Sequence, residues 1–124
     1  MKQLSLFGAE SEIFWTPSQI KRKEALDNGK TILLNKKLDS VLIVYAKAKG
    51  LLVAIDRTSD WGNPFKIGVD GDRDTVCDKF DLYLDKNLIL KKRLKKLQGK
   101  ALQCWCYPKR CHGEKLIKSL EQLV

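Results

Sequence analysis

Residues 100–113 of this 124-residue chain read KALQCWCYPKRCHG and hold three of the four cysteines and the only histidine. The pattern predicts a short buried strand over residues 101–105. Gly99 interrupts the chain before this segment, and Pro108 cannot take part in a sheet ladder after it. Because strand side chains alternate, Cys104 and the Cys106 that follows the strand would share one face, with Trp105 on the other.

A terminal helix is expected after this strand. Leucine and isoleucine recur at helical spacing over residues 116–123, which makes Gly113 the entry to a helix. Cys111 and His112 are therefore expected at its N-terminus, where unpaired N–H groups and the helix dipole favour a thiolate or a bound anion. A strand that runs through a polar loop into a helix is also where open α/β sheets place their sites.

Further elements precede this region. Thr16 and Pro17 are typical of a helix start, and Asn28-Gly29 of its end. The pattern then predicts a strand over residues 31–34, a helix over 39–49 that is apolar around most of its girth and largely buried, and a strand over 51–55. Strand, helix and strand in this order predict a right-handed parallel crossover.

A second group of helices is expected before the cysteine-rich strand. Asp72 or Asp74 is a candidate N-cap for a helix that carries Val76, Phe80 and Leu84 on one face. Taken together, these elements predict a small α/β domain over residues 15–124, built as a three-layer sandwich with a short, mainly parallel sheet. Residues 1–14 form a tail before it.

The composition indicates a protein with a polyanionic partner. The net charge is +9, and residues 86–100 contain seven lysines and arginines with no acid. This run is either the solvated face of a helix with Leu90, Leu94 and Leu97 buried, or a surface that contacts phosphates. No apolar run is long enough for a membrane span, and the N-terminus is too polar for a signal peptide. We therefore expect a cytoplasmic protein with reduced thiols and no membrane partner.

The segment after the second strand combines polar and aromatic side chains. It reads DRTSDWGNPF over residues 56–65. Arg57 and Asn63 are candidates for holding a phosphate and a polar group of a substrate, and Trp61 for stacking on a base or ring. The alternative is that Asn63 bonds its own backbone while Trp61 and Phe65 fill the core, which we favour for the two aromatic residues.

The N-terminal tail contains a possible partner peptide. Gln3-Leu4-Ser5-Leu6-Phe7 resembles the short motif with which bacterial replication and repair proteins dock on the sliding clamp of the DNA polymerase. Leu6 and Phe7 would be the apolar anchors, and Gln3 would supply side-chain hydrogen bonds. Alternatively, Leu4, Leu6 and Phe7 pack on the domain.

An ordered set of motifs carries a family resemblance. The set comprises Arg57 with WGNPF at 61–65, GDR at 71–73, GK at 99–100, CWC at 104–106 with Pro108, and CHG at 111–113. It resembles a family of small bacterial and phage proteins catalogued as domain of unknown function 4326, over residues 51 to 120. The family name supplies no reaction, and it leaves any cofactor unknown.

Two functions from different classes remain open. One is an enzyme, or degenerate enzyme, acting on a nucleotide, nucleoside or nucleic-acid base in a pocket formed by residues 57–65 and 104–113. In this pocket Cys111 is the nucleophile or orients His112, and Cys106 completes the group. The other is a non-catalytic accessory protein, tethered to the clamp by its tail, that holds nucleic acid with the basic segment.

A third interpretation is a zinc-stabilised binding module. Cys104, Cys106, Cys111 and His112 are suitable zinc ligands, but their spacing is shorter than that of common structural zinc sites. Cys111 and His112 are adjacent and would diverge. We therefore assign no metal ligand, and we expect a metal to be absent or substoichiometric.

Overall fold

Local capping interactions set the ends of several helices. The structure, a computed structural model, describes residues 14–123. Thr16 and Gln19 form a reciprocal capping box at the start of the first helix, in which Thr16 Oγ1 accepts from Gln19 N at 3.1 Å. In chain order the elements are α1 (Pro17–Asp27), β1 (Ile32–Asn35), α2 (Ser40–Ala48), β2 (Leu52–Ala54), α3 (Arg73–Lys86), α4 (Leu88–Arg93), the 3-10 helix η2 (Leu94–Leu97), β3 (Ala101–Cys104) and α5 (Gly113–Glu121).

The three strands form one parallel sheet in the order β1-β3-β2. Leu102 in β3 is the register partner of both Leu33 in β1 and Val53 in β2. The last strand in the sequence is therefore the central strand. β1 and β2 are parallel, as the strand-helix-strand order predicts, but β3 lies between them. All three strands end at the same edge of the sheet.

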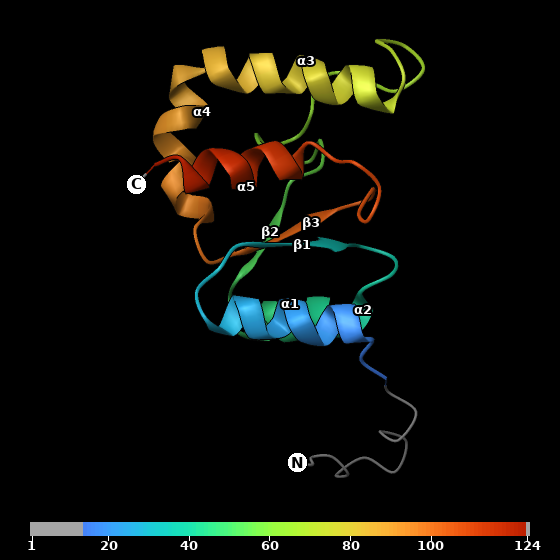
Figure 1. Cartoon of the computed structure of the whole chain (residues 1–124), viewed down its shortest axis with the longest axis vertical. Helices are drawn as coiled ribbons and strands as arrows, with labels where there is room; N and C mark the ends of the chain where they lie inside the picture. The colour runs from blue at the N-terminus through green and yellow to red at the C-terminus, as the bar shows by residue number, and fades with distance from the viewer. Residues whose placement is uncertain (1–13, 124) are drawn as a thin grey trace.

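Helices cover both faces of this sheet, which gives the expected α/β sandwich (Figure 1). Leu34 faces α1 and α2 and packs with Leu26 and Leu42. Leu102 faces the other way and packs with residues of α3, α4, η2 and α5. The alternation of strand side chains thus separates two apolar clusters, one on each side of the sheet. The predicted leucine stripe of the basic segment, Leu90, Leu94 and Leu97, is buried.

Two local predictions were wrong. The helix over 39–49 was expected to be largely buried, but only Leu42 and Ala46 of α2 are buried, and Val44 is 69% exposed. Only one face of α2 packs on the sheet, so apolar side chains on its other faces stay exposed. The cysteine-rich strand also ends at Cys104, one residue early, so Trp105 and Cys106 belong to the loop that follows.

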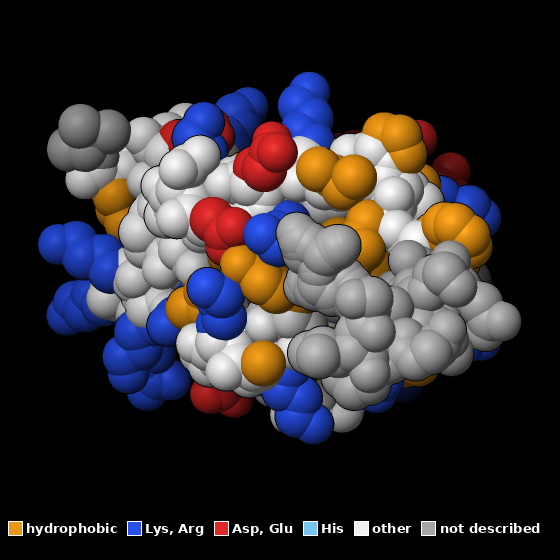
Figure 2. Space-filling model, turned by 90° about the horizontal axis from the view of Figure 1, so that it is seen from below, with side chains coloured by type: hydrophobic (Ala, Val, Ile, Leu, Met, Phe, Trp, Pro, Cys, Tyr) orange, Lys and Arg blue, Asp and Glu red, His pale blue; other side chains and the backbone are white. Residues whose placement is uncertain are grey.

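The predicted clamp-binding peptide, Gln3 to Phe7, lies outside the described residues. Within the part of the chain that the structure describes, no helix is long and apolar enough to cross a membrane. Figure 2 views the face formed by α1 and α2, where lysine and arginine side chains project at many points around the margin. The positive charge is therefore not confined to residues 86–100.

Candidate functional site

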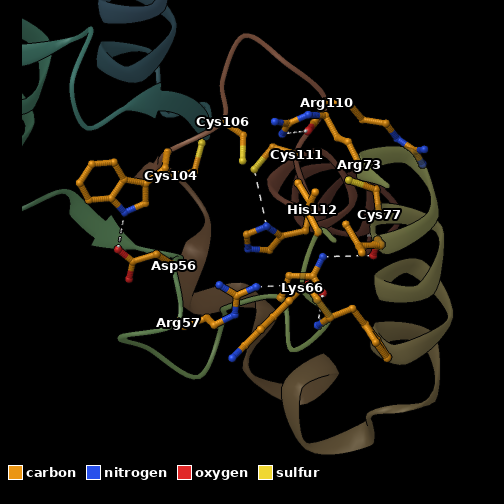
Figure 3. Close-up of a pocket in the computed structure, with 15 residues that line it drawn as sticks. Asp56, Arg57, Lys66, Arg73, Cys77, Cys104, Cys106, Arg110, Cys111 and His112 are labelled. Carbon is orange, nitrogen blue, oxygen red and sulfur yellow. Dashed lines mark hydrogen bonds between the residues drawn. The ribbon is translucent and has the colours of Figure 1, made fainter. Parts of the chain in front are cut away.

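A cleft of about 380 Å³ opens at the carboxyl ends of β2 and β3 (Figure 3). The parallel order of the strands brings the loop after β2 and the loop after β3 to this edge, and the N-terminus of α3 completes the wall. The residues that line the cleft are Asp56, Arg57, Asn63, Phe65, Lys66, Ile67, Arg73, Val76, Cys77, Cys104, Trp105, Cys106, Arg110, Cys111 and His112.

The loop after β2 is held in shape by its own side chains. Ser59 Oγ donates to the Ala54 carbonyl at 2.7 Å, which ties the loop to the strand. Gly62 lies so close to the start of the loop that a Cβ there would be 2.6 Å from the Asp56 carbonyl oxygen. Asn63 accepts from Phe65 N at 2.9 Å and donates to the Val76 carbonyl at 3.1 Å. This loop is therefore pre-organised against α3.

The three substrate-binding candidates of this loop lie in different places. Arg57 is exposed and lines the cleft, with Nη2 3.3 Å from the Phe65 carbonyl oxygen. Asn63 also lines the cleft, although its side-chain amide donates a hydrogen bond that joins the loop to α3. Trp61 packs against the apolar cluster beneath α5 and is not among the lining residues. Core packing, which we favoured for both aromatic residues, is found for Trp61 but not for Phe65, which lines the cleft.

Three cysteines come together at the end of β3. Cys111 is buried, and its sulfur accepts a hydrogen bond from Gly113 N at 3.4 Å. Cys104 is buried in the same cluster and accepts from Tyr107 N at 3.4 Å. Cys106 is half-buried, and its sulfur points toward that of Cys111 (Figure 3). The cluster is therefore open to the cleft mainly through Cys106.

The three thiols differ in acidity, and their mutual interactions are the main cause. Cys111 keeps its proton, because hydrogen bonds to Cys104 and Cys106, together with burial, raise its pKa far above the ordinary thiol value. The hydrogen bond from Cys111 lowers the pKa of Cys106 to about 5, with Arg73 and Lys109 contributing further. The same donor lowers the pKa of Cys104 to about 7. Half-buried Cys106 is therefore the most acidic of the three thiols, mainly through its interaction with Cys111.

His112 is neutral and has a defined tautomer. Its Nε2 lies 2.7 Å from the Ile55 carbonyl oxygen, which can only accept, so Nε2 carries the proton. Nδ1 is then an acceptor, and it faces the Cys111 sulfur at 3.6 Å. Burial lowers the pKa of the imidazole despite hydrogen bonds that act the other way. His112 therefore fixes the position of Cys111 and links α5 to the end of β2.

Four cationic side chains line the cleft, Arg57, Lys66, Arg73 and Arg110. Arg110 forms ion pairs with Asp74 and Asp78 at 3.1 and 2.8 Å. Within residues 14–123, no carboxylate forms an ion pair with Arg57, Lys66 or Arg73. The cleft therefore carries positive charge that is available to an anionic ligand.

Sequence reasoning assigned no site role to Lys66, Arg73 or Trp105. For Arg73 a signal existed, because it occupies the first turn of α3, where the helix dipole disfavours a cation. A cation at this position indicates a purpose other than helix stability. Trp105 was predicted to lie in a buried strand, so its exposure was not expected.

The zinc interpretation gains nothing from this geometry. Among the described side chains, no group of three or more His, Cys, Asp and Glu is arranged to hold a metal ion. Both nitrogens of His112 already face protein partners, the Ile55 carbonyl and the Cys111 sulfur. Of the four suggested ligands, the three cysteines meet, but the imidazole is turned to other contacts.

Comparison with known proteins identifies a family without a described activity. No curated protein and no solved structure matches the chain. A family match covers residues 44–122, which include the loop after β2, all of α3, and the cysteine cluster. The chain thus belongs to the family described as Domain of unknown function (DUF4326).

Proposed function

We propose that this protein binds a nucleotide, free or as part of a nucleic acid, in the cleft, where Cys106 is the candidate nucleophile. The observation that carries the proposal is a cleft in which the half-buried Cys106 thiol, its pKa lowered to about 5, shares the lining with cations that no described carboxylate pairs with. Catalytic cysteines occupy electropositive, partly exposed positions of this kind. Parallel α/β sheets also bind ligands at this edge.

Each polar residue of the cleft then has a distinct task. Arg57 and Lys66 bind the phosphate from one side of the cleft, and Arg73 from the other. Arg73 also lowers the pKa of Cys106. Cys111 is a positioning residue that stabilises the thiolate, and His112 holds Cys111 in place.

A binding experiment tests the phosphate subsite. The full chain is titrated by calorimetry with inorganic phosphate and with the four deoxynucleoside 5′-monophosphates. Removing a charge-assisted hydrogen bond costs about 1.5–3 kcal/mol, so Arg57→Ala or Arg73→Ala should weaken nucleotide binding about 10- to 150-fold. Arg93→Gln is the matched control, because Arg93 is outside the cleft and makes an exposed ion pair with Asp60.

The outcomes separate an enzyme from a binding protein. Loss of binding in the two cleft variants, with Cys106→Ser binding normally, supports an anion-binding site in which the thiolate serves chemistry. If the wild type and Cys106→Ser convert a bound nucleotide at the same rate, or neither converts it, Cys106 is not a nucleophile. If wild-type protein binds none of the probes at millimolar concentration, the whole proposal fails.

The tail suggests where such an activity would be used. We place the protein in bacterial or phage DNA metabolism in the cytoplasm, where thiols stay reduced, with residues 3–7 as the sliding-clamp ligand. Replacing Leu6 and Phe7 by Ala should abolish clamp binding in calorimetry and leave the melting temperature nearly unchanged. Leu88→Ala with Ile89→Ala removes two exposed apolar side chains of α4 and is the matched control. Unmeasurable wild-type binding, or a clear loss of stability in the tail variant, would contradict this.

A further inference from the structure

Trp105 is an exposed tryptophan at the mouth of the cleft. It is the first residue after β3, it lines the cleft, and it is 49% exposed. Trp61, by contrast, packs against the core. Trp105 therefore presents an exposed aromatic ring directly beside the cleft.

The indole is exposed but held in one orientation. Its Nε1 donates to Asp56 Oδ2 at 3.0 Å, and Thr58 N donates to the same carboxyl group at 3.0 Å. The main chain is held as well, because buried Asn35 donates from Nδ2 to the Trp105 carbonyl at 3.1 Å. Trp105 is therefore a rigid aromatic platform, which loses little entropy when a ring stacks on it.

Two lysines stand over this platform from the turn after β1. The ammonium groups of Lys36 and Lys37 lie 5.1 and 5.8 Å from the centre of the Trp105 ring, and both lysines are exposed. Asn35 shapes the turn by accepting from Lys37 N at 2.7 Å. Neither lysine is among the residues that line the cleft.

The strand order aligns these groups along one edge. Since β3 lies between β1 and β2, the edge presents Lys36 and Lys37, then Trp105, then Asp56 and Arg57. Hydrogen bonds from Thr58 and Trp105 lower the pKa of Asp56, which therefore carries a negative charge against the indole N–H. The lysines and Arg57 favour phosphates on either side of the platform, and a base can stack on Trp105 when the two exposed lysine side chains turn from the ring to the phosphate.

We infer that this edge binds a single-stranded nucleic acid, with one base stacked on Trp105 and the flanking phosphates bound by Lys36, Lys37 and Arg57. The inference rests on the proposed function and names its substrate as a polynucleotide. A single nucleotide in the cleft has no second phosphate to reach the lysines. A base can stack on Trp105 only if it is unpaired, which excludes an intact duplex.

Fluorescence anisotropy with a labelled eight-residue oligothymidylate tests this inference. Stacking of one base on an aromatic side chain is worth a factor of about 5 to 150 by substitution, so Trp105→Leu should weaken binding by that factor. Trp105→Phe retains a stacking ring but loses the bond to Asp56, and it should bind much more tightly than Trp105→Leu. Equal losses in the two variants would mean that Trp105 is only structural.

The lysines are tested through salt dependence. Replacing both Lys36 and Lys37 by Gln should reduce the slope of log affinity against log salt by about 1.4, as expected for two lost contacts to a single strand. Lys95→Gln with Lys96→Gln is the charge-matched control in the exposed basic segment. If the Lys95 and Lys96 variant changes the slope and the Lys36 and Lys37 variant does not, the nucleic acid binds at η2 and the inference is wrong.

The two proposals fail in different ways. Thymidine monophosphate is measured beside the oligonucleotide with each variant. If the mononucleotide binds through Arg57 and Arg73 but Trp105→Leu leaves oligonucleotide affinity unchanged, only the edge is disproved. If neither probe binds to the wild type, the proposed function and the inference fall together.

Discussion

The pKa of Cys106 leads to a quantitative prediction about its reactivity. With a pKa of about 5, the thiol is almost fully ionised at pH 6, so its alkylation rate should rise by only about a tenth between pH 6 and pH 8. An ordinary cysteine with a pKa of about 8.5 gains roughly 80-fold in thiolate over the same range. A nearly flat profile therefore distinguishes Cys106 from an unperturbed thiol.

The absolute rate follows from two opposing effects. At pH 6 the thiolate fraction of Cys106 exceeds that of an ordinary thiol about 300-fold, but its lower basicity reduces intrinsic nucleophilicity about 40-fold. Cys106 should thus react about 7-fold faster than free cysteine at pH 6. At pH 8 the fraction advantage shrinks to about 4-fold, and Cys106 should react about 10-fold more slowly.

Iodoacetamide labelling followed by peptide mass spectrometry measures these rates cysteine by cysteine. Cys111→Ala removes the main hydrogen-bond donor to the thiolate, and Arg73→Gln removes the next contributor, so each should restore a rise of rate with pH. Lys118→Gln, an exposed lysine outside this cleft, is the control. A tenfold rise per pH unit in the wild type, or faster labelling of Cys111 than of Cys106, would refute the assignment of the thiolate.

Three further outcomes are expected. The ratio of the labelling rate by anionic iodoacetate to that by neutral iodoacetamide should be higher for Cys106 than for free cysteine. Equal ratios would contradict a cationic cleft. Gly113→Ala places a Cβ against the side chains of Leu33 and Ile55 and should lower the free energy of unfolding by about 1–3 kcal/mol in urea denaturation; an unchanged midpoint would count against this packing. Asp39→Asn leaves Arg22 without its carboxylate partner, at a cost of about 3–5 kcal/mol. Burial opposes ionisation of Asp39, but hydrogen bonds from Arg22, Asn35 and Gln19 prevail and lower its pKa, so the wild type should lose stability as pH falls below about 4 while the variant loses less. An equal loss of stability with falling pH in the wild type and in Asp39→Asn would contradict this role of Asp39.

Local patterns were sufficient for much of the fold. Thr16 with Pro17 predicts the start of α1, and Asp72 is the N-cap of α3, because a cap depends only on the side chain and the next three residues. The parallel sheet also followed from the order of strands and helices. The burial of α2 did not, because whether Val44 is covered depends on elements distant in the sequence.

The candidate site was predicted in outline but not in its chemistry. The sequence alone indicated that the loop after residue 55 and the loop after residue 104 would meet, since parallel strands end at one edge. Tertiary contacts assigned the roles within it. His112 meets the Ile55 carbonyl across 57 positions of sequence, and that bond sets the tautomer that faces Cys111. Arg73, brought from α3, is one of the groups that lower the pKa of Cys106. Acidity and exposure depend on the atoms within a few ångströms of a group, and here those atoms belong to distant segments of the chain.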